Sequence, residues 1–139
     1  MAGDTRAVTV RWRPGTGSMR FDATAPGRSA ILVDGDGREA ASPVELLLVA
    51  AATCAASDVV MILEKQRVAL RALDVAVQGT RREETPRRYT AIHFRFTVAG
   101  EGADETKTRR AVDLSLEKYC SVVASLAADL RVTYDVALA

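Results

Sequence analysis

The sequence predicts an α+β fold in which a mostly antiparallel sheet packs on a long central helix. Alternating apolar and polar segments occur in groups, three before residue 40, two in the middle of the chain and one at its end. Helical segments separate these groups, so the order is βββ-α-ββ-α-α-β. This order lacks the regular βαβ alternation that is typical of a parallel sheet. With 139 residues, 48% of them hydrophobic, residues 1–139 have the size of a single domain with its own core.

The first forty residues contain three candidate strands. Residues 7–13 (AVTVRWR) and residues 18–24 (SMRFDAT) alternate in polarity, and residues 29–35 (SAILVDG) form a short apolar run. Segments that contain Gly, Pro and Asp lie between and after them and have the chemistry of turns. We therefore expect three short strands joined by turns.

A long helix begins after the third strand. Ser42 is a suitable N-cap, Pro43 suits the first helical position and Glu45 occupies the third. Ser42 and Glu45 then form a capping box, in which each side chain accepts a hydrogen bond from the backbone of the other. We expect this helix to end at about Lys65 or Arg67.

This helix is expected to be buried. From Leu46 to Leu63 it is apolar or small on every side, which requires protein around the whole helix. Glu45 and Asp58 lie near the two ends of the apolar run, which also contains Ser and Thr, so we do not expect it to cross a membrane. The first twenty residues lack the continuous apolar segment of a signal peptide, so we expect a cytoplasmic protein.

Two long alternating segments follow, residues 69–82 and residues 87–100, and predict a β-hairpin. In the second strand, one face carries only apolar residues: Ile92, Phe94, Phe96 and Val98. The other face carries Tyr89, Ala91, His93, Arg95 and Thr97. We interpret His93, on the polar face beside Arg95, as an ordinary surface or hydrogen-bonded histidine.

The tip of this hairpin, residues 81–88 (RREETPRR), is basic but contains two glutamates. We interpret it as a solvated loop. The formal net charge of the whole chain is +1. This balance gives no electrostatic reason to expect nucleic acid or an anionic membrane as a partner.

The last part of the chain predicts two helices and a strand. Residues 104–119 have helical periodicity, and Ser121 is a suitable cap for a short second helix over residues 122–128. Residues 130–138 alternate and predict the terminal strand.

The chain contains two cysteines, Cys54 inside the long helix and Cys120 at the junction of the last two helices. They can be two independent structural residues, because free cysteine is among the most buried residue types. Alternatively, they form a peroxidatic and resolving pair, in which one thiolate becomes a sulfenic acid that condenses with the second thiol. Together with the single histidine, His93, they are too few for a closed Cys/His zinc site.

The stretches SPVELLLVAAATCAASDVV (residues 42–60) and EKYCSV (residues 117–122) resemble the OsmC/Ohr family of organic hydroperoxide and osmotically induced thiol peroxidases. The strand and helix order agrees over nearly the whole chain. The resemblance implies an intertwined homodimer, with the two long helices packed together and two active sites at the subunit interface. It also implies that Cys54 is the peroxidatic thiol and Cys120 the resolving thiol.

The resemblance further implies the partners of the reaction. These are a small organic hydroperoxide and an external dithiol reductant, which is a lipoyl group in the Ohr-type relatives. No metal and no bound organic cofactor is needed, and neither nucleic acid nor a membrane takes part.

Ohr-type relatives hold the attacking thiolate with an arginine and a glutamate, and the glutamate directly follows the proline of the helix cap. Here that position is Val44, and the acid comes one residue later, at Glu45. At about 100° per residue, Val44 lies about 80° around the helix from Cys54, whereas Glu45 lies about 180° away. We interpret Glu45 mainly as a capping residue. A role as the catalytic acid is the second interpretation of this residue.

The best candidate for the activating arginine is Arg20, followed by Arg11, Arg13 and Arg28. Asp58 lies one turn after Cys54, about 40° away on the same face, and opposes thiolate formation unless a cation pairs with it. Lys118 is either that cation or a solvated residue.

These departures place the chain nearest to the divergent OsmC-like branch of the family. The predicted function is a thiol-dependent peroxidase that reduces organic hydroperoxides through a Cys54 sulfenic acid and a Cys54–Cys120 disulfide. One alternative is a non-catalytic OsmC-like dimer that binds a small apolar ligand or senses redox state, with structural cysteines. Another is an enzyme that uses Cys54 for other thiol chemistry on an electrophile.

Overall fold

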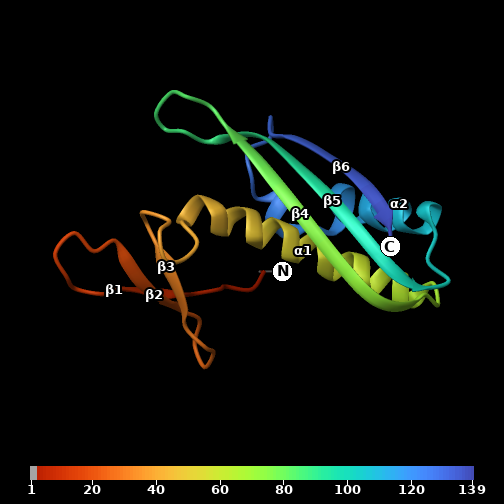
Figure 1. Cartoon of the computed structure of the whole chain (residues 1–139), viewed down its shortest axis with the longest axis horizontal. Coiled ribbons are helices and arrows are strands. Elements are labelled where there is room, and N and C mark those ends of the chain that lie inside the picture. The colour runs from red at the N-terminus through yellow and green to blue at the C-terminus, as the bar shows by residue number, and fades with distance from the viewer. Residues whose placement is uncertain (1–2) are drawn as a thin grey trace. The chain divides into compact units, whose positions relative to one another are not determined.

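The computed structural model describes residues 3–139 and confirms the α+β class and the predicted order of the elements (Figure 1). The chain forms two compact units, which divide between Leu47 and Leu48. The predicted sheet is divided accordingly into two three-stranded sheets. That residues 1–139 act as one domain stays a prediction.

The first unit contains an antiparallel sheet in the order β1-β2-β3. Its strands are β1 (Thr9–Trp12), β2 (Arg20–Thr24) and β3 (Ile31–Asp34). Each strand is shorter than the segment that predicts it, because most of the flanking residues have no regular secondary structure. Several large apolar side chains of this unit are about half exposed or more: Val8, Val10, Trp12, Met19 and Ile31.

Helix α1 (Pro43–Lys65) begins and ends as the sequence predicts. The Ser42 N–H donates to Glu45 Oε1 at 3.0 Å and the Glu45 N–H donates to Ser42 Oγ at 3.4 Å, which confirms the capping box. At the other end, the Val68 N–H donates to Leu63 O and the Arg67 N–H to Glu64 O, both at 3.0 Å. This is a Schellman motif, and it holds Arg67 in the left-handed region (φ 62°).

Only one face of α1 is buried within the chain. The buried face contains Ala51, Ala52, Ala55, Val59 and Leu63. The opposite face forms an exposed stripe of Val49, Ala50, Thr53, Ser57 and Met61. The expectation that protein surrounds the whole helix is therefore met on one side only.

The two hydroxyls of the exposed stripe are bonded within the helix. Thr53 Oγ1 donates to Val49 O at 2.7 Å and Ser57 Oγ donates to Thr53 O at 2.8 Å. By length and composition α1 is also apolar enough to cross a membrane, a property that it shares with the core helices of globular proteins. Its packing on the second sheet makes it the central helix of this fold.

The second unit contains a sheet in the order β4-β5-β6. Strand β4 (Ala69–Arg81) pairs antiparallel with β5 (Tyr89–Glu101), as the sequence predicts. Strand β6 (Arg131–Leu138) pairs parallel with β5. The parallel pair arises because the chain leaves β5 and returns through helices that cross one face of the sheet. Figure 1 shows α1 and α2 on the same face of this sheet.

The helical segment before β6 differs from the prediction. Helix α2 (Glu105–Leu114) starts where the sequence predicts a helix, and its N-cap is Asp104, whose side chain accepts from the Lys107 N–H at 2.7 Å. From Ser115 to Tyr119 the chain is a π-helix, η1, instead of continuing as an α-helix. Helix α3 (Ser121–Ala124) is shorter than predicted, and its N-cap is Cys120, so the prediction of Ser121 as the cap was wrong. The extended backbone of Cys120 (φ −71°, ψ 101°) separates the two helices.

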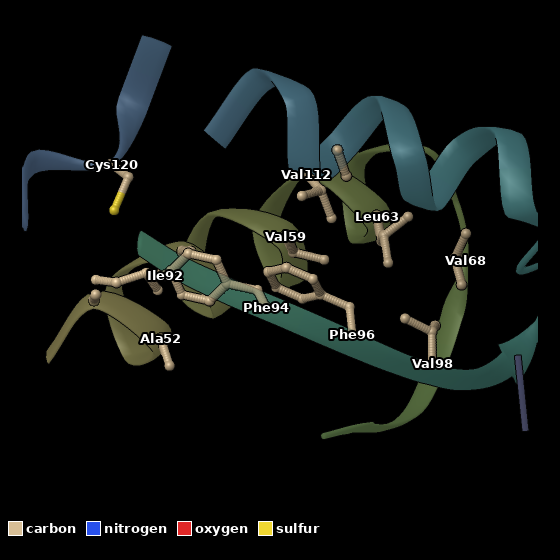
Figure 2. Close-up of a cluster of buried hydrophobic side chains, with 13 residues drawn as sticks. Ala52, Val59, Leu63, Val68, Ile92, Phe94, Phe96, Val98, Val112 and Cys120 are labelled. Atoms are coloured by element: carbon tan, nitrogen blue, oxygen red, sulfur yellow. The ribbon is translucent and has the colours of Figure 1, made fainter. Parts of the chain in front are cut away.

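The core of the second unit lies between β5 and the helices (Figure 2). The predicted apolar face of β5 is confirmed, since its members Ile92, Phe94, Phe96 and Val98 are all buried. Figure 2 shows Phe94 and Phe96 beside Val59 of α1. The ring centroids of Phe94 and Phe96 are 6.0 Å apart.

Tyr89 does not share the polar face of β5 with His93, which corrects the prediction for this residue. Tyr89 packs against the core, because a β-bulge between Thr80 and Arg81 shifts the register at the start of the strand. Gly79 leaves room for it, since a Cβ at this position would collide with the Tyr89 ring.

His93 is a hydrogen-bonded histidine, as predicted. Its Nδ1 lies 2.7 Å from Thr133 Oγ1 and its Nε2 lies 3.4 Å from Asp135 Oδ1. The arginines of the hairpin tip are not simply solvated. Arg81 Nε donates to Arg87 O at 2.6 Å, and Arg88 forms an ion pair with Asp129 at 3.0 Å.

We expect Arg67→Gly to stabilise the protein by about 0.5–1 kcal/mol. Glycine adopts a positive φ without the steric cost of a Cβ, which exceeds the entropy that glycine adds to the unfolded chain. Urea unfolding at a fixed protein concentration measures the change. Arg67→Ala is the control, because it keeps the steric cost. Equal stability of the two variants would contradict the expectation.

Candidate functional site

The structure brings together the two cysteines that the sequence singles out. Cys54 lies in the middle of α1 and is partly exposed, whereas Cys120 lies between η1 and α3 and is buried. Both are free thiols, and they lie close enough together that Cys54 raises the pKa of Cys120. Figure 2 shows the Cys120 sulfur directed toward the part of the core that contains Ile92.

The surroundings of Cys120 keep it protonated at neutral pH. Burial is the largest effect and raises the pKa of the Cys120 thiol to about 11. The backbone N–H groups of Val123 and Val122 act in the opposite direction, while the neighbouring Cys54 raises this pKa further. Cys120 is therefore a poor nucleophile on its own.

The π-helix places Cys120 at this position. The Cys120 N–H donates to Ser115 O at 2.7 Å, which is the i→i+5 bond that defines a π-turn. The extra residue in this turn ends the helix, and the extended backbone at Cys120 follows. Short π-helical segments are rare and are frequent at functional sites.

Asp58, one turn after Cys54 on α1, has a neutral partner. Ser115 Oγ donates to Asp58 Oδ2 at 2.8 Å and lies 3.5 Å from Ala55 O. Lys118, one of whose two interpretations is the cation beside Asp58, places its Nζ 5.4 Å from the ring centroid of Tyr119. Of the two interpretations of Lys118, the structure therefore favours the solvated residue, since Lys118 is exposed.

The sequence did not single out Ser115. It follows Ala111 by four residues and so lies on the apolar face of the predicted helix, and it is fully buried. A serine on the apolar face of an amphipathic helix was the available signal, because a buried hydroxyl requires a partner.

The two candidate activating residues lie in the first unit. Arg20 forms an ion pair with Glu39 at 2.8 Å. Glu45 accepts hydrogen bonds from Ser42, whose backbone N–H is the main cause that lowers the pKa of Glu45. Glu45 is thus a capping residue, as interpreted from the sequence. A catalytic role for Arg20 or Glu45 stays a prediction.

Metal-binding side chains do not gather in the part of the chain that the structure describes. Within residues 3–139 no group of three or more His, Cys, Asp and Glu side chains is arranged to hold a metal ion.

Comparison with known proteins identifies the fold family. The sequence model of the OsmC-like protein family matches residues 35–135. The chain belongs to the OsmC-like family. The resemblance that the two cysteine motifs suggest is therefore confirmed.

Relatives of this OsmC-like protein match over nearly the whole chain. Protein YhfA of Escherichia coli strain K12 is 41% identical over 127 residues, which cover 91% of this chain and 92% of YhfA. A hypothetical protein from Aquifex aeolicus VF5 is 27% identical, with a TM-score of 0.82 and 99% of both chains covered. The organic hydroperoxide resistance protein OhrB of Bacillus subtilis is 17% identical, with a TM-score of 0.59 and 98% of both chains covered. At that identity OhrB shows the shared fold alone.

We expect alkylation of Cys120 by iodoacetamide to accelerate about tenfold per pH unit between pH 8 and pH 10. The reason is that a thiol with a pKa of about 11 is almost fully protonated there, and only the thiolate reacts. Peptide mapping by mass spectrometry measures the rate at each cysteine separately. The same measurement in denaturant, where both thiols are solvated, is the control. A rate for Cys120 that reaches its plateau below pH 9 would contradict the expectation.

Proposed function

We propose that this OsmC-like protein is a thiol-dependent peroxidase that reduces organic hydroperoxides to alcohols. The observation that carries the proposal is that Cys54 packs against the hydrophobic cluster that contains Cys120, close enough to raise the pKa of Cys120. Neighbouring thiols need little movement to form a disulfide, which requires Cα atoms about 4.4–6.8 Å apart. OhrB, which shares the fold, is described as an organic hydroperoxide resistance protein.

In the proposed first step, the Cys54 thiolate attacks the distal oxygen of the hydroperoxide. The new S–O bond forms as the O–O bond breaks, and the leaving alkoxide takes up the proton that Cys54 lost and becomes the alcohol. Cys54 is then a sulfenic acid. In the second step the Cys120 sulfur attacks Cys54, the S–S bond forms and the hydroxyl group leaves as water with the Cys120 proton.

The different surroundings of the two thiols support these separate roles. Cys54 is partly exposed, so a hydroperoxide can reach it, whereas Cys120 is buried and protonated at neutral pH. A protonated thiol reacts slowly with peroxide, which reserves Cys120 for the sulfenic acid. Arg20 remains our candidate for the cation that stabilises the Cys54 thiolate.

The apolar surroundings of the cysteine pair support an organic hydroperoxide as the substrate. Cys120 belongs to the hydrophobic core cluster, and Val122, Val123 and Leu126 pack against this cluster. An alkyl group gains from burial against such side chains, whereas hydrogen peroxide has no apolar part.

The disulfide must be reduced before a second cycle. We propose an external dithiol of the lipoyl type, in a cytoplasmic setting, as the reductant. One of its thiolates attacks the Cys54–Cys120 disulfide, and its second thiol closes the reductant to a disulfide while both protein thiols are released.

The exposed stripe on α1 supports a homodimer. Its residues are small or apolar, and its hydroxyls donate to carbonyl groups of the same helix. Small side chains let a second helix approach closely, and a covered stripe would bury the remaining apolar face of α1. We propose that the stripe packs on α1 of a second copy, as the family resemblance implies.

A non-catalytic role has one observation in its favour. Cys120 is buried in an apolar cluster, which is also the usual environment of a structural cysteine. In this alternative the protein binds a small apolar ligand or senses redox state, and the cysteines react only slowly.

We expect the reduced protein to react with cumene hydroperoxide at least about a hundredfold faster than free cysteine, because a catalytic thiol is activated and positioned. Stopped-flow measurement of thiol loss tests this, with hydrogen peroxide as the slower comparison substrate. Cys54→Ser should abolish the fast phase. Cys120→Ser should keep it and accumulate a sulfenic acid that dimedone traps. A wild-type rate no faster than that of free cysteine would reject the peroxidase and favour the non-catalytic alternative.

We expect Ser57→Arg to convert the dimer to monomers at micromolar concentration, because the stripe cannot bury a charge without a partner. Sedimentation velocity measures the mass of the species in solution. Glu84→Arg, at the exposed hairpin tip, introduces the same side chain away from the stripe and should leave the dimer intact. Dimers of the Ser57 variant as stable as those of the control would show that the stripe is not the interface.

A further inference from the structure

The Ser115 hydroxyl joins the two segments that carry the cysteines through a short contact to Asp58 and a longer one, at 3.5 Å, to Ala55 O, and the chemistry proposed above uses neither. Ser115 Oγ donates to Asp58 Oδ2 at 2.8 Å. Asp58 follows Cys54 by one helical turn of α1, and Ser115 opens the π-helix that ends just before Cys120. Ser115 is fully buried, so its hydroxyl has no access to water as another partner.

Ser115 is bonded to both segments at once. Its side chain contacts Asp58 of α1, while its carbonyl accepts the Cys120 N–H at 2.7 Å. The path from Cys54 to Cys120 therefore consists of one α-helical turn, one side-chain hydrogen bond and one π-helical turn. The interaction between the two thiols closes this path into a ring.

A polar contact constrains the position of η1 on α1 more tightly than the apolar contacts around it. Ala51, Ala55 and Val59 form the neighbouring buried surface of α1, and such side chains tolerate small displacements. A hydrogen bond weakens steeply with distance and angle, and a buried hydroxyl that loses its partner destabilises the displaced arrangement. The disulfide requires Cα atoms about 4.4–6.8 Å apart, so a small displacement of η1 matters.

We propose that the Ser115–Asp58 hydrogen bond is a positioning contact that holds Cys120 against Cys54 for disulfide formation. The inference deepens the proposed function, because it takes Cys54 and Cys120 to be a redox couple. Neither Ser115 nor Asp58 reacts with the substrate. Both act on the reaction through the position of Cys120.

The test is the equilibrium of the full-length protein with glutathione redox buffers. Oxidised glutathione accepts two electrons and yields two glutathione thiols, while Cys54 and Cys120 lose their protons and form the disulfide. Ser115→Ala should shift this equilibrium toward the dithiol at least about tenfold, which is a reduction potential about 30 mV less negative. Mass spectrometry after acid quenching and alkylation measures the two forms.

Thr108→Val is the matched control. Thr108 is also fully buried, but its Oγ1 donates to Asp104 O at 2.8 Å within its own helix α2. Its loss removes a buried hydroxyl but no hydrogen bond to α1, so the equilibrium should stay within about twofold of the wild type. Thermal unfolding of each variant verifies that it is folded.

Variants of Asp58 test the other side of the contact. Asp58→Ala should shift the equilibrium as Ser115→Ala does, whereas Asp58→Asn keeps an acceptor for the hydroxyl and should restore most of the wild-type value. The double variant of Ser115 and Asp58 to Ala should shift no further than either single variant, because the two residues act as one pair. If Ser115→Ala does not fold, the Asp58 variants carry the test, since Asp58 is partly exposed.

The inference is overturned if Ser115→Ala and Asp58→Ala keep the wild-type equilibrium, or if Thr108→Val shifts it equally. The glutathione assay needs no hydroperoxide, so it separates the two proposals. A wild-type protein that forms no Cys54–Cys120 disulfide in any buffer would overturn both. The expected shift in a protein that does not reduce cumene hydroperoxide would support the positioning contact and reject the peroxidase.

Discussion

The second unit depends on the packing of one face of α1 against the apolar face of β5. Val59 and Leu63 of the helix contribute the larger side chains of this face, and Phe94 and Phe96 lie opposite them. Burial of each such side chain contributes about 1.5–3 kcal/mol, so this contact outweighs any single polar interaction in the unit. It also determines the orientation of α1 and therefore the partial exposure of Cys54.

The cysteine pair lies at the margin of this core, and its asymmetry follows from that position. Cys120 is a member of the buried cluster, whereas Cys54 is only partly buried. The apolar side raises the pKa of Cys120, and the open side leaves Cys54 accessible. A single packing arrangement thus creates one protected and one accessible thiol. Among the fully buried side chains of the described residues, only that of Ser115 hydrogen-bonds to α1. Its partner Asp58 lies one helical turn from Cys54.

Part of the apolar surface of α1 that the sequence predicts to be buried is exposed in the single chain. Helix α1 is apolar on all sides, yet the chain covers only the face that packs on β5. Trp12 of β1 and Ile31 of β3 are also about half exposed. Apolar surfaces of this kind on a helix and a sheet mark contacts with another protein, and a second copy of the chain is the partner we propose.

Local patterns in the sequence determined the elements, and tertiary packing decided how the site is assembled. The capping box of Ser42 and Glu45 and the alternation along β5 depend on residues a few positions apart, so the sequence alone predicted both correctly. The parallel pairing of β6 with β5 and the bond between Ser115 and Asp58 depend on residues that are distant in the sequence. The periodicity of apolar residues in the sequence does not predict such contacts, because they arise only when helices and strands pack against one another. The sequence therefore identified two cysteines, and the tertiary structure made them neighbours.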